Sequence, residues 1–228
     1  MIRIGDLTLS DDAVAVHERR DTDPDVPART IRITGSVGDA GTLGELESRL
    51  DDIVRAAFGG DTGDVQLSLR PGRCLSARLQ RFDREVHRTG REAVFTAWFT
   101  PSQAFEEAES ESQESWTIRA WGAALPVEND GTTSAPLQVQ FTAEGPITTP
   151  AFDDGVRRLS YSGVMAAGQV LVVDGAARRA TLNGADVTAL MAGDYPQLEP
   201  GAATLHFYDD FDSSHQGAAT VRWHARWW

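Results

Sequence analysis

The chain has 228 residues, 41% of them hydrophobic and 24% charged, which is the composition of an ordinary soluble globular protein. Its hydrophobic runs are shorter than the roughly 20 residues that a membrane helix needs, and the N-terminal MIRIGDLTLSDD alternates polar and apolar residues where a signal peptide has a long apolar core. We therefore expect synthesis in the cytoplasm and no membrane association. The length favours two domains over one.

The charge is strongly acidic. The net charge is −13, and all 21 basic side chains are arginine because the sequence contains no lysine. Such a surface repels nucleic acid, since binding requires cations that neutralise phosphates. Arginine without lysine is explained either by GC-rich coding or by a salt-rich cytoplasm, in which an acidic surface keeps proteins soluble. Both explanations remain open, and the second predicts a halophilic host.

The first block of the chain, to about residue 105, predicts a β-rich module. MIRIGDLTLS and RTIRITGSVG alternate apolar and polar residues, as half-buried strands do. Between them, ERRDTDPDVPA is charged and contains Pro24 and Pro27, so it predicts an exposed loop or the tip of a long hairpin. Three more strands are expected in VQLSLRP, RCLSARLQRFDREV and EAVFTAWFTPS, with a turn at HRTG between the last two.

One helix is predicted within this block. Thr42 is a suitable N-cap residue, and Glu45 three positions later completes a capping box. Glycines at positions 59 and 60 are expected to end the helix. Apolar residues at spacings of three and four mark one face, and they are Leu43, Leu46, Leu50, Ile53, Val54 and Ala57.

Residues 106–115, EEAESESQES, are acidic and serine-rich without apolar anchors. This composition predicts a linker at a domain boundary, or alternatively an exposed tip within one domain. We place the domains at 1–108 and 109–228. The second block reads as short strands at even intervals with Gly or Pro between them, which is typical of a β-sandwich. DVTALMAGDYPQL predicts at most one helical turn.

The sequence predicts no catalytic, cofactor-binding or metal-ligating residues. It lacks the nucleophile, phosphate-loop and dinucleotide motifs, and the single cysteine, Cys74, excludes an intrachain disulfide and fits a small buried hydrophobe. Asp153 and Asp154 are adjacent and would face opposite sides of a strand. The histidines do not have the short spacings of metal ligands, and they are His17, His87, His206, His215 and His224.

Two further features have more than one interpretation. In YDDFDSSHQG, the residues Asp210, Asp212 and Ser214 alternate as oxygen ligands do in a calcium loop, but the central Gly and closing Glu are missing, which favours a polar hairpin tip. Tryptophans can cap the ends of a sandwich core, stack on sugars or anchor an interface. They are Trp98 in the first block and Trp116, Trp121, Trp223, Trp227 and Trp228 in the second.

Four segments of the second block, in order, resemble the C-terminal part of the phage distal tail protein family, also described as siphovirus tail components. They are GPITTPAF (145–152), GQVLVVDGAARRATLNGADV (168–187), YPQLEPGAATLHF (195–207) and the final ATVRWHARWW. The residues that match the family pattern are Gly145, Pro146, Ile147, Pro150, Asp174, Asn183, Gly184, Tyr195, Pro196, Leu198, Pro200 and Gly201. Thr149 and Ala202 stand where the family commonly has Asn. The first block resembles the family in its architecture.

The resemblance implies a mostly β subunit of two domains. The N-terminal belt domain would be a tail-tube-like β module with one packed helix, and the C-terminal domain a galectin-like β-sandwich. Six copies would form a ring between the tail tube and the tip, baseplate hub or fibre proteins, with DNA passing through the lumen without specific binding. The expected location is the tail tip of a virion assembled in the host cytoplasm. The expected role is structural, without enzymatic activity or cofactors.

Two other functions are considered. One is a carbohydrate-binding module that uses Trp121 or Trp223 to hold a host-surface glycan, and exposed aromatic side chains with affinity for glycans would favour it. The other is a hydrolase on a β scaffold, which would require two carboxylates in a shared cleft, about 5–10 Å apart.

Overall fold

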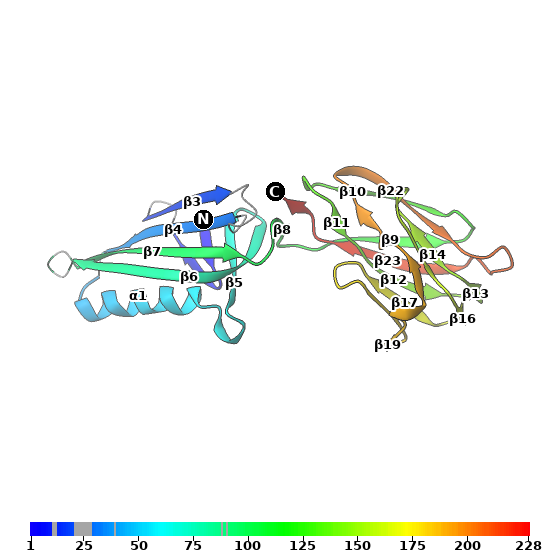
Figure 1. Cartoon of the computed structure of the whole chain (residues 1–228), viewed down its shortest axis with the longest axis horizontal. Coiled ribbons are helices and arrows are strands. Elements are labelled where there is room, and N and C mark those ends of the chain that lie inside the picture. The colour runs from blue at the N-terminus through cyan, green and yellow to red at the C-terminus, as the bar shows by residue number, and fades with distance from the viewer. Residues whose placement is uncertain (11–12, 21–28, 39, 88, 90) are drawn as a thin grey trace. The chain divides into compact units, whose positions relative to one another are not determined.

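The computed structural model describes residues 1–10, 13–20, 29–38, 40–87, 89 and 91–228. The chain divides into two compact units, Met1–Glu109 and Ser110–Trp228 (Figure 1). The predicted mostly β fold with one α-helix is confirmed. The tip of the predicted 18–28 excursion (residues 21–28) and two positions of the HRTG turn lie outside the described residues.

The first unit is an antiparallel sheet with strand order β2-β1-β5-β6-β7-β4-β3, and β8 pairs with the start of β6. The strands are β1 (Ile2–Ile4), β2 (Leu7–Leu9), β3 (Val14–Arg20), β4 (Arg29–Val37), β5 (Asp64–Arg70), β6 (Arg73–His87), β7 (Glu92–Pro101) and β8 (Glu106–Ala108). The N-terminal segment forms two short strands instead of one, because the chain turns back at Gly5, which has φ +56°. Residues 18–20, expected in a loop, belong to β3.

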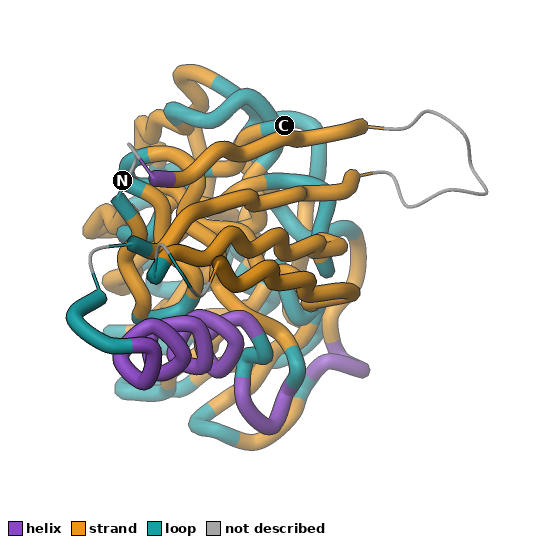
Figure 2. The backbone as a smooth tube through the Cα atoms, turned by 90° about the vertical axis from the view of Figure 1, so that its left-hand side faces the viewer, coloured by secondary structure: helices purple, strands orange, loops and turns teal. Residues whose placement is uncertain are grey.

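Helix α1 (Leu43–Ala57) lies along one face of this sheet (Figure 2). Its predicted capping box is confirmed, since the Thr42 hydroxyl accepts from the Glu45 amide at 3.2 Å and the Glu45 carboxylate accepts from the Thr42 amide at 3.2 Å. The helix ends before Gly59, whose φ of +66° is left-handed and where a Cβ would lie 2.4 Å from the Asp64 carbonyl oxygen. Four of the six predicted apolar positions are buried, namely Leu46, Leu50, Ile53 and Ala57.

The core of the first unit lies between this helix and the sheet. Alternate strand residues face it because side chains on a strand point to opposite sides in turn. The largest fully buried ones are Ile4, Ile31, Ile33, Leu67, Leu75, Phe95 and Phe99, together with Leu46 and Leu50 of the helix. Burying each such side chain stabilises the fold by about 1.5–3 kcal/mol.

The expected linker at 106–115 is wrong at both of its ends. Glu106–Ala108 form β8, and the Glu106 side chain is only 4% exposed. Residues from Ser112 onward already belong to strand β9. Glu106 is buried because arginine side chains surround its carboxylate, and composition alone does not show such a pairing.

The second unit is a β-sandwich. One sheet has the order β10-β22-β14-β15-β20 and the other β19-β18-β17-β12-β23-β9, with antiparallel pairing throughout. The sheet strands are β9 (Ser112–Ile118), β10 (Ala124–Asn129), β12 (Gln138–Ala143), β14 (Ala151–Asp153), β15 (Arg158–Tyr161), β17 (Val170–Asp174), β18 (Arg179–Leu182), β19 (Ala185–Asp186), β20 (Met191–Gly193), β22 (Gly201–Tyr208) and β23 (Gly217–Trp223). Two-residue strands form the small pairs β11 (Ala135–Pro136) with β21 (Gln197–Leu198) and β13 (Ile147–Thr148) with β16 (Val164–Met165). A last strand, β24 (Arg226–Trp227), follows β23, and the predicted helical turn is a 3₁₀ turn at Thr188–Leu190.

Aromatic side chains fill the centre of the sandwich. The Phe141, Phe152 and Phe207 rings have centroids 5.1–6.0 Å apart, and the Trp116 ring meets Phe207 edge-on at 6.4 Å. Trp116 and Trp223 are buried, so for these two the interpretation as core residues is confirmed. Trp121 and Trp228, in contrast, are each 60% exposed.

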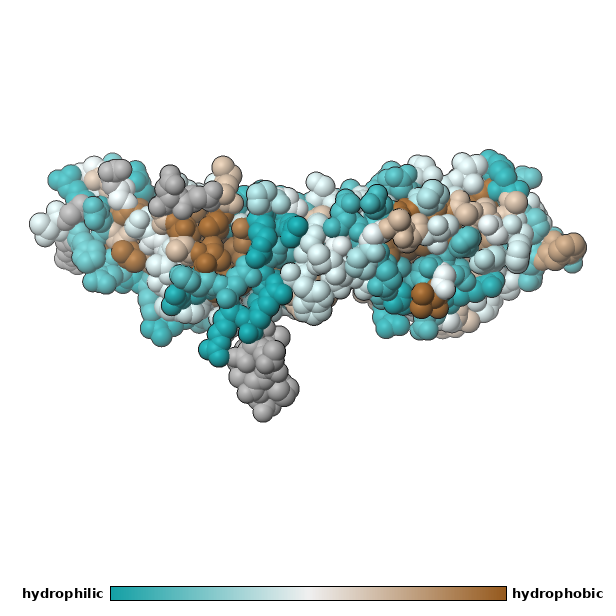
Figure 3. All heavy atoms as spheres, turned by 90° about the horizontal axis from the view of Figure 1, so that it is seen from above, coloured by the Kyte–Doolittle hydropathy of each residue, from teal (hydrophilic) through white to brown (hydrophobic). Residues whose placement is uncertain are grey.

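Hydrophilic residues cover most of the face seen in Figure 3, with smaller apolar areas on both units. Within the described residues, no helix is long and apolar enough to cross a membrane.

Candidate interaction surfaces

Backbone groups hold the loop that contains Asp210, Asp212 and Ser214. Residues 209–216 join β22 to β23, and the amides of Asp210 and Ser214 donate to the carbonyls of Thr148 and Pro146 at 3.0 and 2.9 Å. The Thr148 amide in turn donates to the Ser213 hydroxyl at 2.9 Å. The loop therefore fastens the GPITTP segment to the end of the sandwich. Among the described residues, no three acidic, histidine or cysteine side chains are grouped closely enough to hold a metal ion.

Gly145 of the same segment has a packing role. A Cβ at this position would lie 2.7 Å from the Ser214 side chain, which is closer than real contacts allow. The loop can approach the segment only because glycine has no side chain, and this explains the glycine at the start of the motif.

One histidine in this loop forms a buried ion pair or hydrogen bond. His215 Nδ1 lies 2.6 Å from Asp209 Oδ1, and the Asp209 side chain is fully buried. Burial raises the pKa of Asp209, and the hydrogen bond from His215 opposes that shift. The other histidines lie on separate elements: His17 is on β3, His87 ends β6, His206 is on β22, and His224 follows β23.

The remaining motif residues form turns and anchor strands. Asn183 has φ +50°, and its side-chain oxygen accepts from the Val170 amide at 2.8 Å. The Asp174 carboxylate accepts from the Ala177 amide at 2.9 Å in the β17–β18 turn. Leu198 is fully buried in the sandwich core. The motif therefore encodes the hairpins of the sandwich, and none of these contacts is catalytic.

Asp154 and Cys74 have side chains that can react in enzymes, but their contacts here stabilise the fold or disfavour reactivity. The Asp154 carboxylate accepts from the amides of Val156, Arg157 and Gln197, whereas Asp153 lies on the outer face of β14. Burial, followed by the charges of Glu107 and Glu109, raises the pKa of the Cys74 thiol, which disfavours the reactive thiolate.

A cluster of four charged side chains lies at the base of the connection between β3 and β4, beside the end of β3 and the start of β4. Arg29 Nη2 lies 2.6 Å from Glu106 Oε1 and 2.9 Å from Glu18 Oε2. Arg70 contacts the same two carboxylates, with 3.0 Å to Glu18 Oε1 and a close contact to Glu106. We call Glu18, Arg29, Arg70 and Glu106 the hairpin-base cluster. It is charge-balanced and connects β3, β4, β5 and β8.

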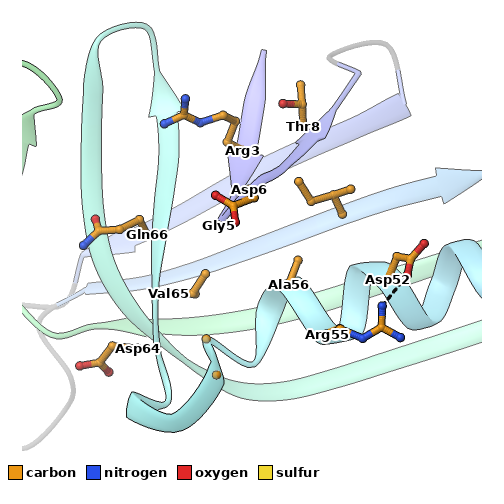
Figure 4. Close-up of a pocket in the computed structure, with 13 residues that line it drawn as sticks. Arg3, Gly5, Asp6, Thr8, Asp52, Arg55, Ala56, Asp64, Val65 and Gln66 are labelled. Carbon is orange, nitrogen blue, oxygen red and sulfur yellow. Dashed lines mark hydrogen bonds and ion pairs between the residues drawn. The ribbon is translucent and has the colours of Figure 1, made fainter.

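A groove of about 940 Å³ lies between the β1–β2 turn, the end of α1 and β5 (Figure 4). Ala56 and Val65 lie in its middle, and charged side chains stand at its rim. Of these, Arg55 is already paired with Asp52 at 2.7 Å. Because acidic and basic groups alternate around an open floor, the groove offers no set of converging groups for a ligand.

An exposed aromatic cluster lies on the second unit. The Trp121 ring meets Tyr208 edge-on with centroids 4.9 Å apart. The Arg158 guanidinium lies over the Tyr208 ring at 4.6 Å, and His206 stacks beside Tyr208 at 6.1 Å. We call Trp121, Arg158, His206 and Tyr208 the Trp121 patch. The sequence analysis singles out Trp121 but does not place Arg158, His206 and Tyr208 beside it. The spacing of His206 and Tyr208, two residues apart on one strand, is a sequence signal that these two share a face.

Comparisons with known proteins agree with this architecture. Residues 130–227 match the family described as siphovirus-type tail component, C-terminal domain. Among solved structures, the SPP1 Dit (gp 19.1) protein, described as a paradigm of the hub adsorption apparatus in phages that infect Gram-positive bacteria, is similar over 99% of this chain and 91% of its own, with 19% identity and a TM-score of 0.67. No curated protein matches the chain.

The fold and the matched domain define a siphovirus-type tail component, which is a structural protein of the virion tail. The match over residues 130–227, together with the shared fold, supports a protein of the phage distal tail type. The family resemblance drawn from the sequence is therefore confirmed.

Proposed function

We propose that this protein is a distal tail ring adaptor that joins the tail tube to the tail tip or baseplate hub. The observation that supports it most is that the likeness to the SPP1 Dit fold extends over 99% of this chain and is not limited to the second unit. The role is structural, and neither an enzymatic activity nor a cofactor is part of the proposal.

In this proposal, residues 1–108 are a tail-tube-like belt domain and residues 109–228 a galectin-like sandwich. Six copies form a closed ring through head-to-tail contacts, which require two different complementary surfaces on each subunit. The first unit has two distinct sheet edges, because β2 and β3 each pair with one strand among the described residues. Strand edges carry unpaired backbone groups that a neighbouring chain can bind.

The ring stands between the tail tube and the hub or fibre proteins at the tip of the virion, after assembly in the host cytoplasm. DNA passes through the lumen without specific binding, and the net charge of −13 supports this because like charges repel. The acidic, lysine-free composition also supports a halophilic host.

The first test is the mass of the purified chain from low to high salt, with negative-stain images of any large species. We expect particles of six times the 24.7 kDa chain mass, with a central hole, either in solution or on the ends of added tail tubes. A protein that stays monomeric at every salt concentration and binds neither end of a tail tube would contradict the adaptor function.

A carbohydrate-binding module is the second candidate function. Trp223 is buried and cannot hold a glycan, which corrects one half of that hypothesis. Trp121 is exposed and belongs to an aromatic cluster, and this observation keeps the second candidate under consideration.

A further inference from the structure

We propose that the Trp121 patch is a binding site for a neutral saccharide. The inference rests on the second candidate function and names its residues and its class of ligand. It does not depend on ring assembly, so either proposal can fail while the other holds.

The aromatic surface of the patch is fixed in place by the backbone. In the turn before β10, the Gly122 amide donates to the Phe207 carbonyl at 2.9 Å, and the Phe207 amide donates to the Ala123 carbonyl at 2.9 Å. Gly122 has φ +71°, which permits the tight turn that brings Trp121 beside Tyr208. Because the backbone of this turn is already ordered, a ligand that stacks on the Trp121 ring does not have to order it.

Polar groups surround these rings on the same face of the sheet. His206 of β22 is directly opposite Asp153 of β14, and Asp153 is directly opposite Arg158 of β15. Directly opposed residues of antiparallel strands project to the same side. Their neighbours Phe152 and Phe207 face the core, so this row faces outward.

The hydrogen-bonding groups of the patch are available. Within the described part of the chain, the Trp121 indole N–H, the Tyr208 hydroxyl, the His206 ring nitrogens and the Arg158 guanidinium make no hydrogen bond with protein groups. Ala124 lies opposite His206 on β10 and contributes only a methyl group beside that ring. The patch thus combines flat aromatic surface with several free donors and acceptors, as ligand sites do.

The charges of the patch indicate a neutral ligand. Arg158 disfavours a cationic ligand such as a quaternary ammonium, which would otherwise suit a cluster of aromatic rings. Asp153, opposite Arg158, disfavours an anion such as phosphate. A pyranose has an apolar C–H face that stacks on an aromatic ring and a rim of hydroxyls that pair with arginine, histidine and carboxylate. A pyranose therefore matches both the aromatic rings and the polar groups of the patch.

The test uses the full chain labelled with 5-fluorotryptophan, whose six indoles give separate ¹⁹F NMR signals. The probes are the methyl glycosides of galactose, glucose, N-acetylglucosamine and rhamnose, each up to about 20 mM, because millimolar dissociation constants are the weakest that need detection. We expect one probe or more to shift the Trp121 signal in a saturable way. Trp228, which is equally exposed at 60%, provides a matched control signal.

Variants distinguish stacking from a general effect on the fold. Trp121→Ala should weaken the binding about three- to tenfold, and Trp121→Phe should restore part of it, since an aromatic stack contributes about 0.5–1.5 kcal/mol. Arg158→Lys keeps the charge but loses the planar fork, so it should weaken binding as well. Trp228→Ala should leave binding unchanged. Unaltered thermal unfolding of each variant shows that the sandwich is intact.

Two results would overturn the proposal. One is the absence of any saturable shift of the Trp121 signal with every probe. The other is that Trp121→Ala abolishes ring formation or tube binding while no saccharide binds, which would make the patch a protein interface. Saccharide binding by a chain that forms no rings in solution and binds neither end of a tail tube would instead support this inference and contradict the adaptor function.

Discussion

At the scale of single residues, Asp154 makes the clearest contribution to stability. Its side chain is 3% exposed, and burial alone would raise the pKa of the carboxyl. Amide hydrogen bonds from Gln197, Arg157 and Val156 and the Arg157 guanidinium outweigh burial, so the pKa lies below its ordinary value of 3.8. A carboxyl with a lowered pKa stabilises the fold above the unfolded-state pKa, and this contribution is lost as the pH falls through the folded-state pKa.

Asp154→Asn should therefore destabilise the second unit by about 2 kcal/mol at pH 7, since hydrogen bonds to a charged group contribute roughly 1.5–3 kcal/mol. The melting temperature should fall by about 4–8 °C for each kcal/mol in a small domain, or somewhat less in a larger one. Calorimetry from pH 7 to pH 2 should also show a weaker loss of stability below pH 4 than in the parent chain. The exposed Asp130→Asn is the control, and equal effects of the two variants would contradict the prediction.

At the scale of elements, the hairpin-base cluster connects β3, β4, β5 and β8. Two positive and two negative side chains balance there, and Arg29 and Glu106 are 3% and 4% exposed. Removing one member leaves a buried charge without compensation, which costs about 3–5 kcal/mol, whereas removing an opposite pair restores the balance.

Glu106→Leu alone should consequently lower the stability of the first unit more than the double variant Arg29→Met and Glu106→Leu, in which Arg70 and Glu18 still pair. Thermal unfolding of the three chains gives the comparison. The exposed pair Arg55 and Asp52 is the control, because removing Asp52 should change stability by less than about 1 kcal/mol. A double variant that is less stable than the single one would show that the cluster stabilises the fold beyond charge balance.

The same cluster shows what the sequence can and cannot predict at this scale. The capping box of α1 and the turn at Asn183 were predictable because their partners lie a few residues apart in the chain. Glu106 meets Arg29 across 77 positions, so an acidic stretch that looks like a linker contains a buried strand residue. The sequence did not predict all members of the Trp121 patch for the same reason. Strand register decides which distant residues share a face, and the sequence does not show the register.

At the scale of the whole molecule, the excess of acidic side chains dominates the response to salt. The chain has 34 acidic and 21 basic side chains and no lysine, so repulsion between carboxylates opposes the compact state. Salt screens this repulsion, and the Debye length falls from about 10 Å at 0.1 M to about 3 Å at 1 M. The melting temperature should therefore rise with KCl over this range and then level off.

The way in which the melting temperature rises with salt distinguishes two causes, screening of charge repulsion and strengthened burial of apolar surface. Screening depends on ionic strength, so KCl and K₂SO₄ at equal ionic strength should raise the melting temperature alike, and neither should act much beyond about 1 M. Strengthened burial of apolar surface depends on the anion, is larger in sulfate and continues to increase with concentration. A melting temperature that is insensitive to KCl, or that falls, would contradict both the charge argument and the halophilic host proposed from it. A plateau of equal height in the two salts would show that acidic repulsion at low salt, and not a weak core, limits the stability of this tail protein.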